Sequence, residues 1–377
     1  MKKVLFVATV VKTHIMEFHI PYLKMFKRMG WETAVAAKND YENPSDCIIP
    51  YCDNYYNIPF ERNPLKKENL KAYKELKKII MKGEYEIIHC HTPMGAVLTR
   101  LAAKQARKVG TKVFYTAHGF HFYKGAPLFN WLLYYPVEKW LAHYTDVLIT
   151  INKEDYQRAK KFKAGKVCYI PGVGIDFKKF NTNLEDKTEK NKQIRYELGI
   201  PQTAIIILSV GEVNKNKNHK IIIEALSKVK REDIYYVICG RGPLKCEYEN
   251  MAKQFNIANR VILTGYRSDV VDFYKAADIF AFPSFREGLP VSVMEAMAVG
   301  LPVIATRIRG SQDIIKENVN GMLLSPNDCK GFVNAINKLT DSTEIRKNIE
   351  KENIKEAKNF DLPVILKQYK KIYFNEE

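Results

Sequence analysis

Several features of large protein classes are missing from this sequence. Its seven cysteines, spread over 377 residues, form no C-x-x-C pair, which argues against common zinc and redox motifs and indicates reduced thiols. No apolar run reaches the length of a membrane span, and the opening MKKVLFVATVV is too short for a signal peptide and has no cleavage site. No low-complexity tract or short repeat occurs. We therefore expect a cytoplasmic globular protein.

Two local patterns are also absent. The first strand-to-helix turn, Thr9 to His14, contains no glycine, so it does not match the dinucleotide fingerprint and argues against a dehydrogenase. No Asp-x-Asp occurs in the chain, which argues against metal-assisted chemistry. His89-Cys90-His91 suggests a metal site, but in a strand Cys90 points away from both histidines and too few ligands remain. We predict neither a metal nor a cofactor.

Positive charge is in excess, and its distribution is uneven. The formal net charge is +18, of which residues 1–180 carry +14, with 30 Lys and Arg against 16 Asp and Glu. Such a field attracts nucleic acid, anionic lipid or a phosphorylated acceptor. A solvated, lysine-rich surface is the alternative interpretation.

Alternating strand and helix patterns predict an α/β protein. A chain of 377 residues is long for one core and suits two domains. Residues 2–9 and 33–37 are expected to be strands flanking a helix at 17–30, which begins a parallel sheet. The polar stretch 178–192 is the best linker candidate. We therefore place domains at 1–177 and 178–360, followed by an amphipathic C-terminal segment at 361–377.

The most informative stretch is FREGLPVSVMEA, residues 285–296. Gly288 permits a turn, and Pro290 suits a first helical position. The N–H groups of Gly288 and Leu289 would then lie unpaired at the positive end of a helix dipole, where an anion such as a diphosphate binds.

Two carboxylates, Glu287 and Glu295, bracket this anion site. Because an ionised carboxylate accepts two hydrogen bonds from a vicinal diol, both residues suit the hydroxyls of sugars. A diphosphate between two diols describes a nucleotide sugar. The alternative is that Glu287 is an ordinary turn residue and Glu295 a solvated helix position.

The spacing Glu-x7-Glu, followed by AMAVGLPVIAT, resembles the retaining glycosyltransferases of family 4. This resemblance implies the GT-B fold, in which two Rossmann-like domains face each other across a cleft and the C-terminal helix crosses back to the first domain. THIMEFHIPYLKMF resembles a subgroup acting on capsule and exopolysaccharide precursors, although the family's usual glycines are missing there. The resemblance covers nearly the whole chain and is strongest at 204–325.

The resemblance also implies roles for single residues. His118 in TAHGF would hold the donor sugar from the acceptor-binding domain, although a lone histidine at such a position is more often structural. Lys217, in a Gly-x5-Lys turn, would bind phosphate; Glu287 would bind the sugar hydroxyls and Glu295 the ribose. Glu212 replaces the family's arginine, and either Lys215 or Arg241 is expected to compensate. The remaining donor-binding candidates are Gly211, Gly242, Tyr266, Arg267, Gly288 and Leu289, and the acceptor-binding candidates are His14, His19, His91, Phe120 and Tyr123.

We therefore expect a metal-independent transferase that moves a sugar, of the N-acetylated hexosamine type, from UDP to a polyprenyl-diphosphate-linked saccharide. We also expect peripheral attachment to the anionic inner face of the plasma membrane, through Phe120–Tyr135 and the lysines of a helix at 65–82; burial of these aromatics is the alternative. A GT-B epimerase would need acid and base groups and does not share the Glu-x7-Glu pattern. A nucleic-acid-binding protein is a third hypothesis, but no recognised motif supports it.

Overall fold

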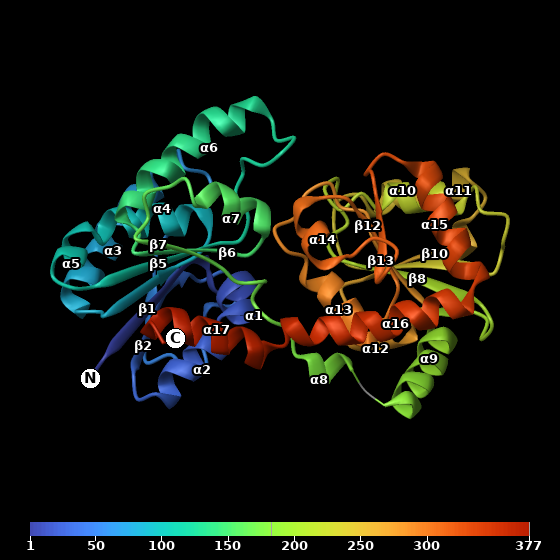
Figure 1. Ribbon diagram of the computed structural model, residues 1–377, viewed down its shortest axis with the longest axis horizontal. Coiled ribbons are helices and arrows are strands. Elements are labelled where there is room, and N and C mark those ends of the chain that lie inside the picture. The colour runs from blue at the N-terminus through green and yellow to red at the C-terminus, as the bar shows by residue number, and fades with distance from the viewer. Residues whose placement is uncertain (182, 377) are drawn as a thin grey trace. The chain divides into compact units, whose positions relative to one another are not determined.

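The computed structural model describes residues 1–181 and 183–376. It divides into two compact units, Met1–Val173 with Gln368–Glu377, and Gly174–Lys367. Each unit is an α/β body built on one parallel sheet, as Figure 1 shows. The prediction of two parallel-sheet domains is confirmed. No helix in the described part of the chain has the length and apolarity needed to cross a bilayer.

The sheet of the first unit has the order β3-β2-β1-β4-β5-β6-β7. The order reverses between β1 and β4, and ligands bind at such a switch point, beyond the carboxyl ends of the strands. The strands are β1 (Lys3–Val10), β2 (Glu32–Lys38), β3 (Asn54–Asn57), β4 (Ile87–Cys90), β5 (Lys112–Ala117), β6 (Val147–Thr150) and β7 (Lys166–Tyr169). The helices are η1 (Val11–Ile15), α1 (Met16–Phe18), α2 (Ile20–Arg28), η2 (Pro44–Asp46), α3 (Glu68–Gly83), α4 (Pro93–Ala102), α5 (Lys104–Lys108), α6 (Leu128–Leu141), η3 (Ala142–Tyr144) and α7 (Lys153–Ala159).

The segment after β1 departs from the single helix predicted at 17–30. It begins with η1, a π-helical turn, and α2 begins at Ile20 with Pro21 in its first turn. Pro21 has no backbone N–H, so the helix restarts there instead of continuing. Wide π turns of this kind occur often at functional sites.

The sheet of the second unit has the order β10-β9-β8-β11-β12-β13, with its switch point between β8 and β11. The strands are β8 (Ile205–Val210), β9 (Ile234–Cys239), β10 (Val261–Gly265), β11 (Ile279–Phe282), β12 (Val303–Thr306) and β13 (Gly321–Leu324). The helices are α8 (Phe177–Phe180), α9 (Leu184–Leu198), α10 (Lys220–Leu226), α11 (Lys245–Gln254), η4 (Ala258–Arg260), α12 (Val270–Ala276), α13 (Val291–Val299), α14 (Arg309–Ile314), α15 (Cys329–Asp341), α16 (Thr343–Ala357), η5 (Lys358–Phe360) and α17 (Leu362–Phe374).

The prediction of a linker at 178–192 is wrong. Apart from residue 182, which lies outside the described part, the stretch belongs to the second unit and most of it is helical, in α8 and α9. Its charged side chains find partners: Lys190 lies 3.0 Å from Asp272 on α12, and Lys187 lies 3.0 Å from Glu350 on α16. The polar composition suggested a linker, whereas these charges attach the helix to its neighbours.

The C-terminal helix α17 begins in the second unit, and its last residues cluster with the first. Tyr369 packs edge-on against Tyr22, with ring centroids 4.9 Å apart, and Tyr373 hydrogen-bonds His89 Nδ1. The other ring nitrogen of His89 lies 2.8 Å from Thr116 Oγ1. His89 is thus a satisfied core residue.

Candidate functional site

In the second unit, the turns that follow β8 and β11 meet at the switch point. Asn216 O accepts a hydrogen bond from Phe285 N at 2.8 Å, which joins the two turns. Lys217 Nζ lies 2.7 Å from Glu287 Oε1, and each side chain is 21% exposed. Lys217 and Glu287, predicted separately as site residues, therefore form one half-buried ion pair.

The backbone around Lys217 explains the spacing of its motif. Gly211 has φ +149, and a Cβ there would lie 3.2 Å from Lys217 Cε, so a glycine leaves room for the lysine stem. Asn214 Oδ1 accepts from Lys217 N at 3.0 Å. Beneath the turn, buried His219 pairs with Tyr236 OH at 2.9 Å and lies 3.2 Å from the carbonyl of Glu212. Burial lowers the pKa of His219 to about 4, so the ring is neutral near pH 7.

Helix α13 begins at Val291, and Pro290 is its N-cap residue. The prediction of Pro290 as the first helical residue is therefore wrong by one position; its extended ψ of 111 sets the chain direction into the helix. Among the described residues, the N–H groups of Gly288 and Leu289 have no hydrogen-bond acceptor. Arg309 Nε donates to the carbonyl of Glu287 at 2.9 Å and fixes this turn from below. Free N–H groups at a helix start suit an anion.

Glu295 lies in α13 and is only partly exposed. Its Oε2 accepts a hydrogen bond from the hydroxyl of Tyr274 at 2.9 Å. Tyr274 is fully buried, and burial, followed by the charge of Glu295, raises its pKa well above the usual value. A buried tyrosine therefore orients the carboxylate, which does not fit the solvated helix position considered as the alternative.

The other predicted donor residues differ in their surroundings. A Cβ at Gly242 would lie 2.2 Å from the carbonyl of Val213, so a glycine is required where these two turns pack together. Arg241 lies 5.6 Å from the ring centroid of Tyr266, which is 68% exposed. Lys215 is exposed.

Arg267 is engaged within the unit. Its guanidinium lies 2.6 Å from Asp269 and 2.8 Å from Glu197. The hydrogen bonds that Arg267 donates to Asp269 raise the pKa of Arg267 further above its usual value. The guanidinium is thus held between two carboxylates, and its donor-binding role stays a prediction.

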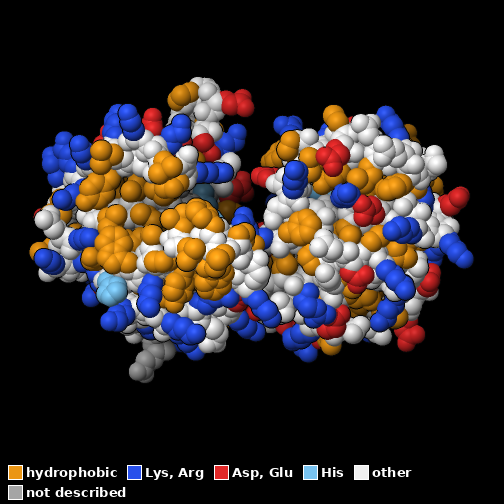
Figure 2. Space-filling model, turned by 90° about the horizontal axis from the view of Figure 1, so that it is seen from above, with side chains coloured by type: hydrophobic (Ala, Val, Ile, Leu, Met, Phe, Trp, Pro, Cys, Tyr) orange, Lys and Arg blue, Asp and Glu red, His pale blue; other side chains and the backbone are white. Residues whose placement is uncertain are grey.

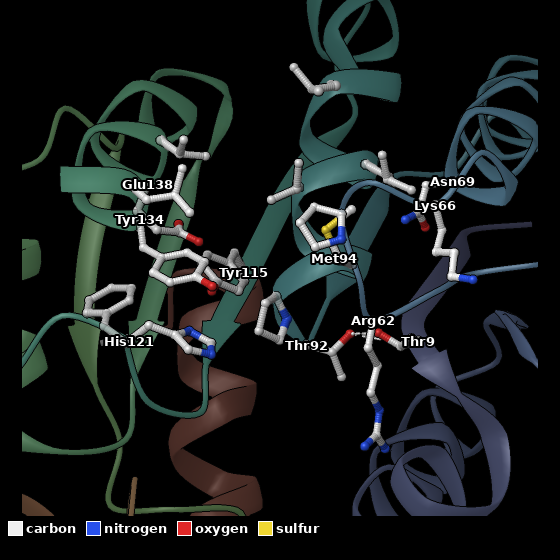
Figure 3. Close-up of a pocket in the computed structure, with 18 of the residues that line it drawn as sticks. Thr9, Arg62, Lys66, Asn69, Thr92, Met94, Tyr115, His121, Tyr134 and Glu138 are labelled. Atoms are coloured by element: carbon white, nitrogen blue, oxygen red, sulfur yellow. Dashed lines mark hydrogen bonds between the residues drawn. The ribbon is translucent and has the colours of Figure 1, made fainter. Parts of the chain in front are cut away.

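In the first unit, a cavity of about 820 Å³ lies between α3, α4 and α6. In Figure 3, Arg62, Lys66 and Asn69 lie on one side of this cavity, and Tyr134 and Glu138 on the other. Its polar lining includes Thr9, Thr13, His14, Arg62, Lys66 and Asn69, and its apolar lining includes Leu70, Met94, Val97, Leu98, Leu101, Leu133 and Val137. Basic and apolar walls in one cavity suit an amphiphile that carries an anionic group.

A buried ion pair supports the wall of this cavity, and the sequence did not reveal it. Arg100 is 1% exposed and lies 2.8 Å from Glu138. Its guanidinium carbon lies 4.2 Å from the ring centroid of Tyr115. The only sequence signal is an arginine within the apolar helix GAVLTRLA.

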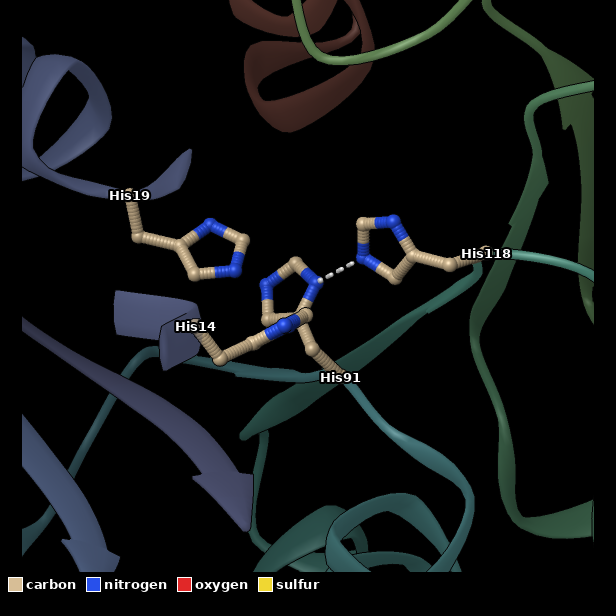
Figure 4. Close-up of side chains that lie close together, drawn as sticks. All are labelled: His14, His19, His91 and His118. Carbon is tan, nitrogen blue, oxygen red and sulfur yellow. Dashed lines mark hydrogen bonds between the residues drawn. The ribbon is translucent and has the colours of Figure 1, made fainter. Parts of the chain in front are cut away.

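The predicted residues His14, His19, His91 and His118 come together at the carboxyl ends of β1, β4 and β5. Their rings point toward one another in Figure 4. His91 Nδ1 lies 3.3 Å from His118 Nε2. Burial lowers the pKa of His118 to about 4 and is the main cause that lowers the pKa of His14 to about 3, so neither ring carries charge near neutral pH.

The aromatic segment after β5 is mostly core at its start and exposed farther on. Phe120 and Phe122 are buried and stack with centroids 4.7 Å apart, although Phe120 also lines the cavity. Tyr123 is partly exposed. For Phe120 the alternative of burial therefore holds, and membrane contact through Phe120–Tyr135 stays a prediction. The exposed apolar side chains of this region lie on α6 and are Leu128, Phe129, Leu132, Leu133, Val137 and Trp140.

Two family descriptions match this chain. Residues 3–152 match "Glycosyl transferase 4-like", and residues 190–356 match "Glycosyl transferases group 1". EpsD of Bacillus subtilis (strain 168), named as a glycosyltransferase, is 42% identical over 376 residues, which cover 99% of this chain and 96% of EpsD.

A second relative is the UDP-Gal:alpha-D-GlcNAc-diphosphoundecaprenol alpha-1,3-galactosyltransferase of Escherichia coli. It is 31% identical over 283 residues, which cover 73% of this chain and 71% of that protein. Among solved structures, Anabaena HepE in complex with UDP and glucose superposes with a TM-score of 0.82 at 19% identity, covering 100% of both chains. That likeness concerns the fold alone.

Proposed function

Because the chain belongs to glycosyltransferase family 4, the group 1 glycosyltransferases of the GT-B fold, we propose a specific reaction for it. The enzyme transfers a sugar from a UDP-sugar to a polyprenyl-diphosphate-linked saccharide in capsule or exopolysaccharide synthesis, and the anomeric configuration is retained. The observation that carries the proposal is the meeting of Lys217 and Glu287, 2.7 Å apart, beside the free N–H groups of Gly288 and Leu289.

The charges of this site suit departure of a nucleoside diphosphate. Negative charge grows on the diphosphate as the glycosidic bond breaks, and pre-positioned cations and N–H groups stabilise it. Lys217 and the start of α13 supply these groups. Since Lys217 is paired with Glu287 here, donor binding is expected to divide the pair: the ammonium turns to phosphate and Glu287 accepts hydroxyls of the sugar.

Glu295 is proposed to bind the ribose of the nucleotide. Tyr274 donates to one carboxylate oxygen at 2.9 Å, and an ionised carboxylate is an acceptor that suits the two hydroxyls of a ribose. His118 is proposed to contact the transferred sugar. The acceptor's proton would pass to a phosphate oxygen as the new bond forms on the face that the diphosphate leaves, so no side chain is needed as the base.

The cavity of the first unit supports a lipid-linked acceptor. Its basic wall, with Arg62 and Lys66, suits a diphosphate, and its apolar wall of leucine, valine and methionine suits an isoprenoid chain. The E. coli relative is named for a diphosphoundecaprenol-linked acceptor, which combines a diphosphate with an isoprenoid chain.

The outer surface near α6 supports contact with an anionic membrane. Figure 2, which looks onto the α6 side of the first unit, shows hydrophobic side chains gathered there and bordered by Lys and Arg. Leu132 on α6 is 69% exposed and Leu70 on α3 is 61% exposed, while Lys71 and Lys74 of α3 are exposed beside Leu70. Apolar side chains inserting into the interface and lysines facing anionic headgroups would give reversible attachment without a membrane span.

The alternatives have less support. A GT-B epimerase requires an acid and a base for elimination, and the paired Lys217 and Glu287 are better explained by diphosphate and sugar binding. A nucleic-acid-binding protein would use the basic surface, but the exposed leucines and phenylalanine of α6 are better suited to lipid.

The test is a reaction panel. The full chain is incubated with UDP-N-acetylhexosamines, UDP-galactose and UDP-glucose, each with and without a polyprenyl-diphosphate monosaccharide, and released UDP and the anomeric proton of the product are measured. We expect UDP release that depends on the acceptor and an α-linked product from one α-linked donor, with an N-acetylhexosamine as the predicted sugar. Epimerised UDP-sugar without acceptor, or a product of inverted configuration, would contradict the proposal.

A further inference from the structure

Four of the histidines of the first unit, His14, His19, His91 and His118, form a cluster that the proposed reaction does not fully use. They come from three neighbouring strands of the sheet: His14 and His19 follow β1, His91 directly follows β4, and His118 directly follows β5. Because the carboxyl ends of parallel strands share one edge of the sheet, residues far apart in sequence meet there. One nitrogen atom from each ring lies within 4.8 Å of the other three.

Several of these nitrogens have no hydrogen-bond partner although they are buried. Both ring nitrogens of His19 and the Nε2 atoms of His14 and His91 are buried without a partner in the described residues. His19 is 1% exposed and His91 is 2% exposed. A buried polar nitrogen without a partner costs about 1–3 kcal/mol. An ion that takes one nitrogen from each ring would satisfy part of this set, and ordered water would satisfy the rest.

The environment keeps the rings in the form that binds metals. Burial is the largest cause that lowers the pKa of all four. For His14, His19 and His91 the neighbouring histidines act in the same direction, as does the charge of Arg62 for His14. A neutral imidazole has a free lone pair, whereas an imidazolium has none. The cluster therefore offers four uncharged nitrogen donors.

We propose that His14, His19, His91 and His118 bind one divalent transition-metal ion of the Zn²⁺ or Co²⁺ class. Imidazole nitrogen favours these ions over Mg²⁺, Ca²⁺ and Mn²⁺, which prefer oxygen ligands. Nitrogens at about 2.0–2.1 Å from a tetrahedral ion are roughly 3.3 Å apart, which equals the observed 3.3 Å between His91 Nδ1 and His118 Nε2. The longer separations, up to 4.8 Å, close by rotation of the side chains.

The ion would join the π-helical turn after β1 to the ends of β4 and β5. His118 would use Nε2 as its ligand atom, so Nδ1 stays available for the sugar contact. The inference is separate from the proposed reaction, since it concerns binding and stability and does not assign the ion a step in sugar transfer.

The experiment uses the full chain purified without a polyhistidine tag and dialysed against a chelator. It is titrated with Co²⁺ and with Zn²⁺ while metal content, the visible absorption of Co²⁺ and the thermal unfolding midpoint are measured. We expect one ion per chain, a Co²⁺ spectrum typical of nitrogen ligands in tetrahedral geometry, and a higher unfolding midpoint with either ion.

Variants locate the site. His19→Gln and His91→Gln are each expected to lower the Co²⁺ affinity by roughly 100-fold. His143→Gln is the matched control, because His143 is exposed and its ring, among the described hydrogen bonds, contacts only the carbonyl of Trp140, at 3.0 Å. Absence of stoichiometric binding to the wild type, with no change in its unfolding midpoint, would overturn the proposal even if a variant failed to fold. Equal loss in the His143→Gln control would overturn it as well.

Discussion

The two units share one architecture but use it for different chemistry. Each sheet reverses its strand order once, between β1 and β4 or between β8 and β11, and each candidate site lies at that reversal. In the second unit the site holds an ion pair and open N–H groups, whereas in the first it holds neutral, buried imidazoles beside an apolar cavity. Position in the fold thus predicts where a ligand binds, and the turn residues decide which ligand it is.

The difference follows from the turns after the first strand of each sheet. After β8, Gly211 leaves room for the stem of Lys217. After β1 there is no glycine, and a π-helical turn instead carries His14 inward. The charged groups in the second unit would serve an anionic donor. The cavity beside the imidazoles of the first unit would serve an amphiphilic acceptor.

The largest loss of activity is expected from a substitution of Lys217 in the second unit. Lys217→Ala is expected to lower the turnover rate roughly 100-fold or more, because its charge would meet the charge that develops on the diphosphate. Steady-state kinetics with a UDP-sugar measure the effect. Lys220→Ala, which removes an exposed lysine at the start of α10, is the control. A change confined to acceptor affinity would show that Lys217 serves acceptor binding and not departure of the diphosphate.

Charge reversal on the first unit should remove membrane binding. Changing the exposed Lys66, Lys67, Lys71 and Lys74 to Glu is expected to weaken binding to anionic vesicles roughly 30-fold or more, because each basic residue near the surface contributes about 1 kcal/mol. Co-sedimentation at low and high salt measures this. The matched control reverses exposed lysines on the second unit, Lys347, Lys351, Lys355 and Lys358. Binding that ignores salt, lipid charge and all four changes would show that the basic surface is merely solvated.

The apolar surface of α6 should have a smaller effect on the same measurement. Leu132→Ser removes a side chain that is 69% exposed, so folding should be unaffected. We expect vesicle binding to fall roughly fivefold, about 1 kcal/mol, because only part of one leucine is withdrawn from lipid. Phe255→Ser, at a 40% exposed position of the second unit, serves as control. Equal losses in both variants would argue against a specific role for α6.

No effect is expected from Mg²⁺ or Mn²⁺. If Lys217 and the start of α13 neutralise the leaving diphosphate, the rate of sugar transfer should be the same with and without these ions added to enzyme freed of them. UDP release measures the rate. A rate that requires either ion would contradict the metal-free departure, and this outcome is independent of the transition-metal site, whose nitrogen ligands do not favour them.

Much of the fold was predictable because strand and helix patterns are strong where both faces of a sheet are buried. AIIILSV and VLFVAT predicted central strands, and Glu-x7-Glu identified the family. The short edge strand β3 was missed because NYYN has little apolar signal. The linker at 178–192 was misread because ion pairs with α12 cannot be seen in a local window.

Individual site residues were predicted from the sequence, but the contacts between them were not. Pairing of Lys217 with Glu287 and of Glu295 with Tyr274 depends on which strands are adjacent. In the sequence, only His89, Cys90 and His91 suggested a metal site. In the structure Cys90 donates to the carbonyl of Phe114 at 3.3 Å, while His91 meets histidines from two other turns. Long-range adjacency is the information that the sequence alone did not supply.

The most direct test is calorimetric titration of UDP into Glu295→Ala and His118→Ala. If the second unit alone binds the nucleotide, Glu295→Ala weakens UDP binding by roughly 2–4 kcal/mol, since charge-assisted hydrogen bonds to the ribose are lost. His118→Ala leaves the affinity for UDP unchanged, because UDP lacks the transferred sugar. Near-normal affinity in Glu295→Ala, or an equal loss in both variants, would contradict the account.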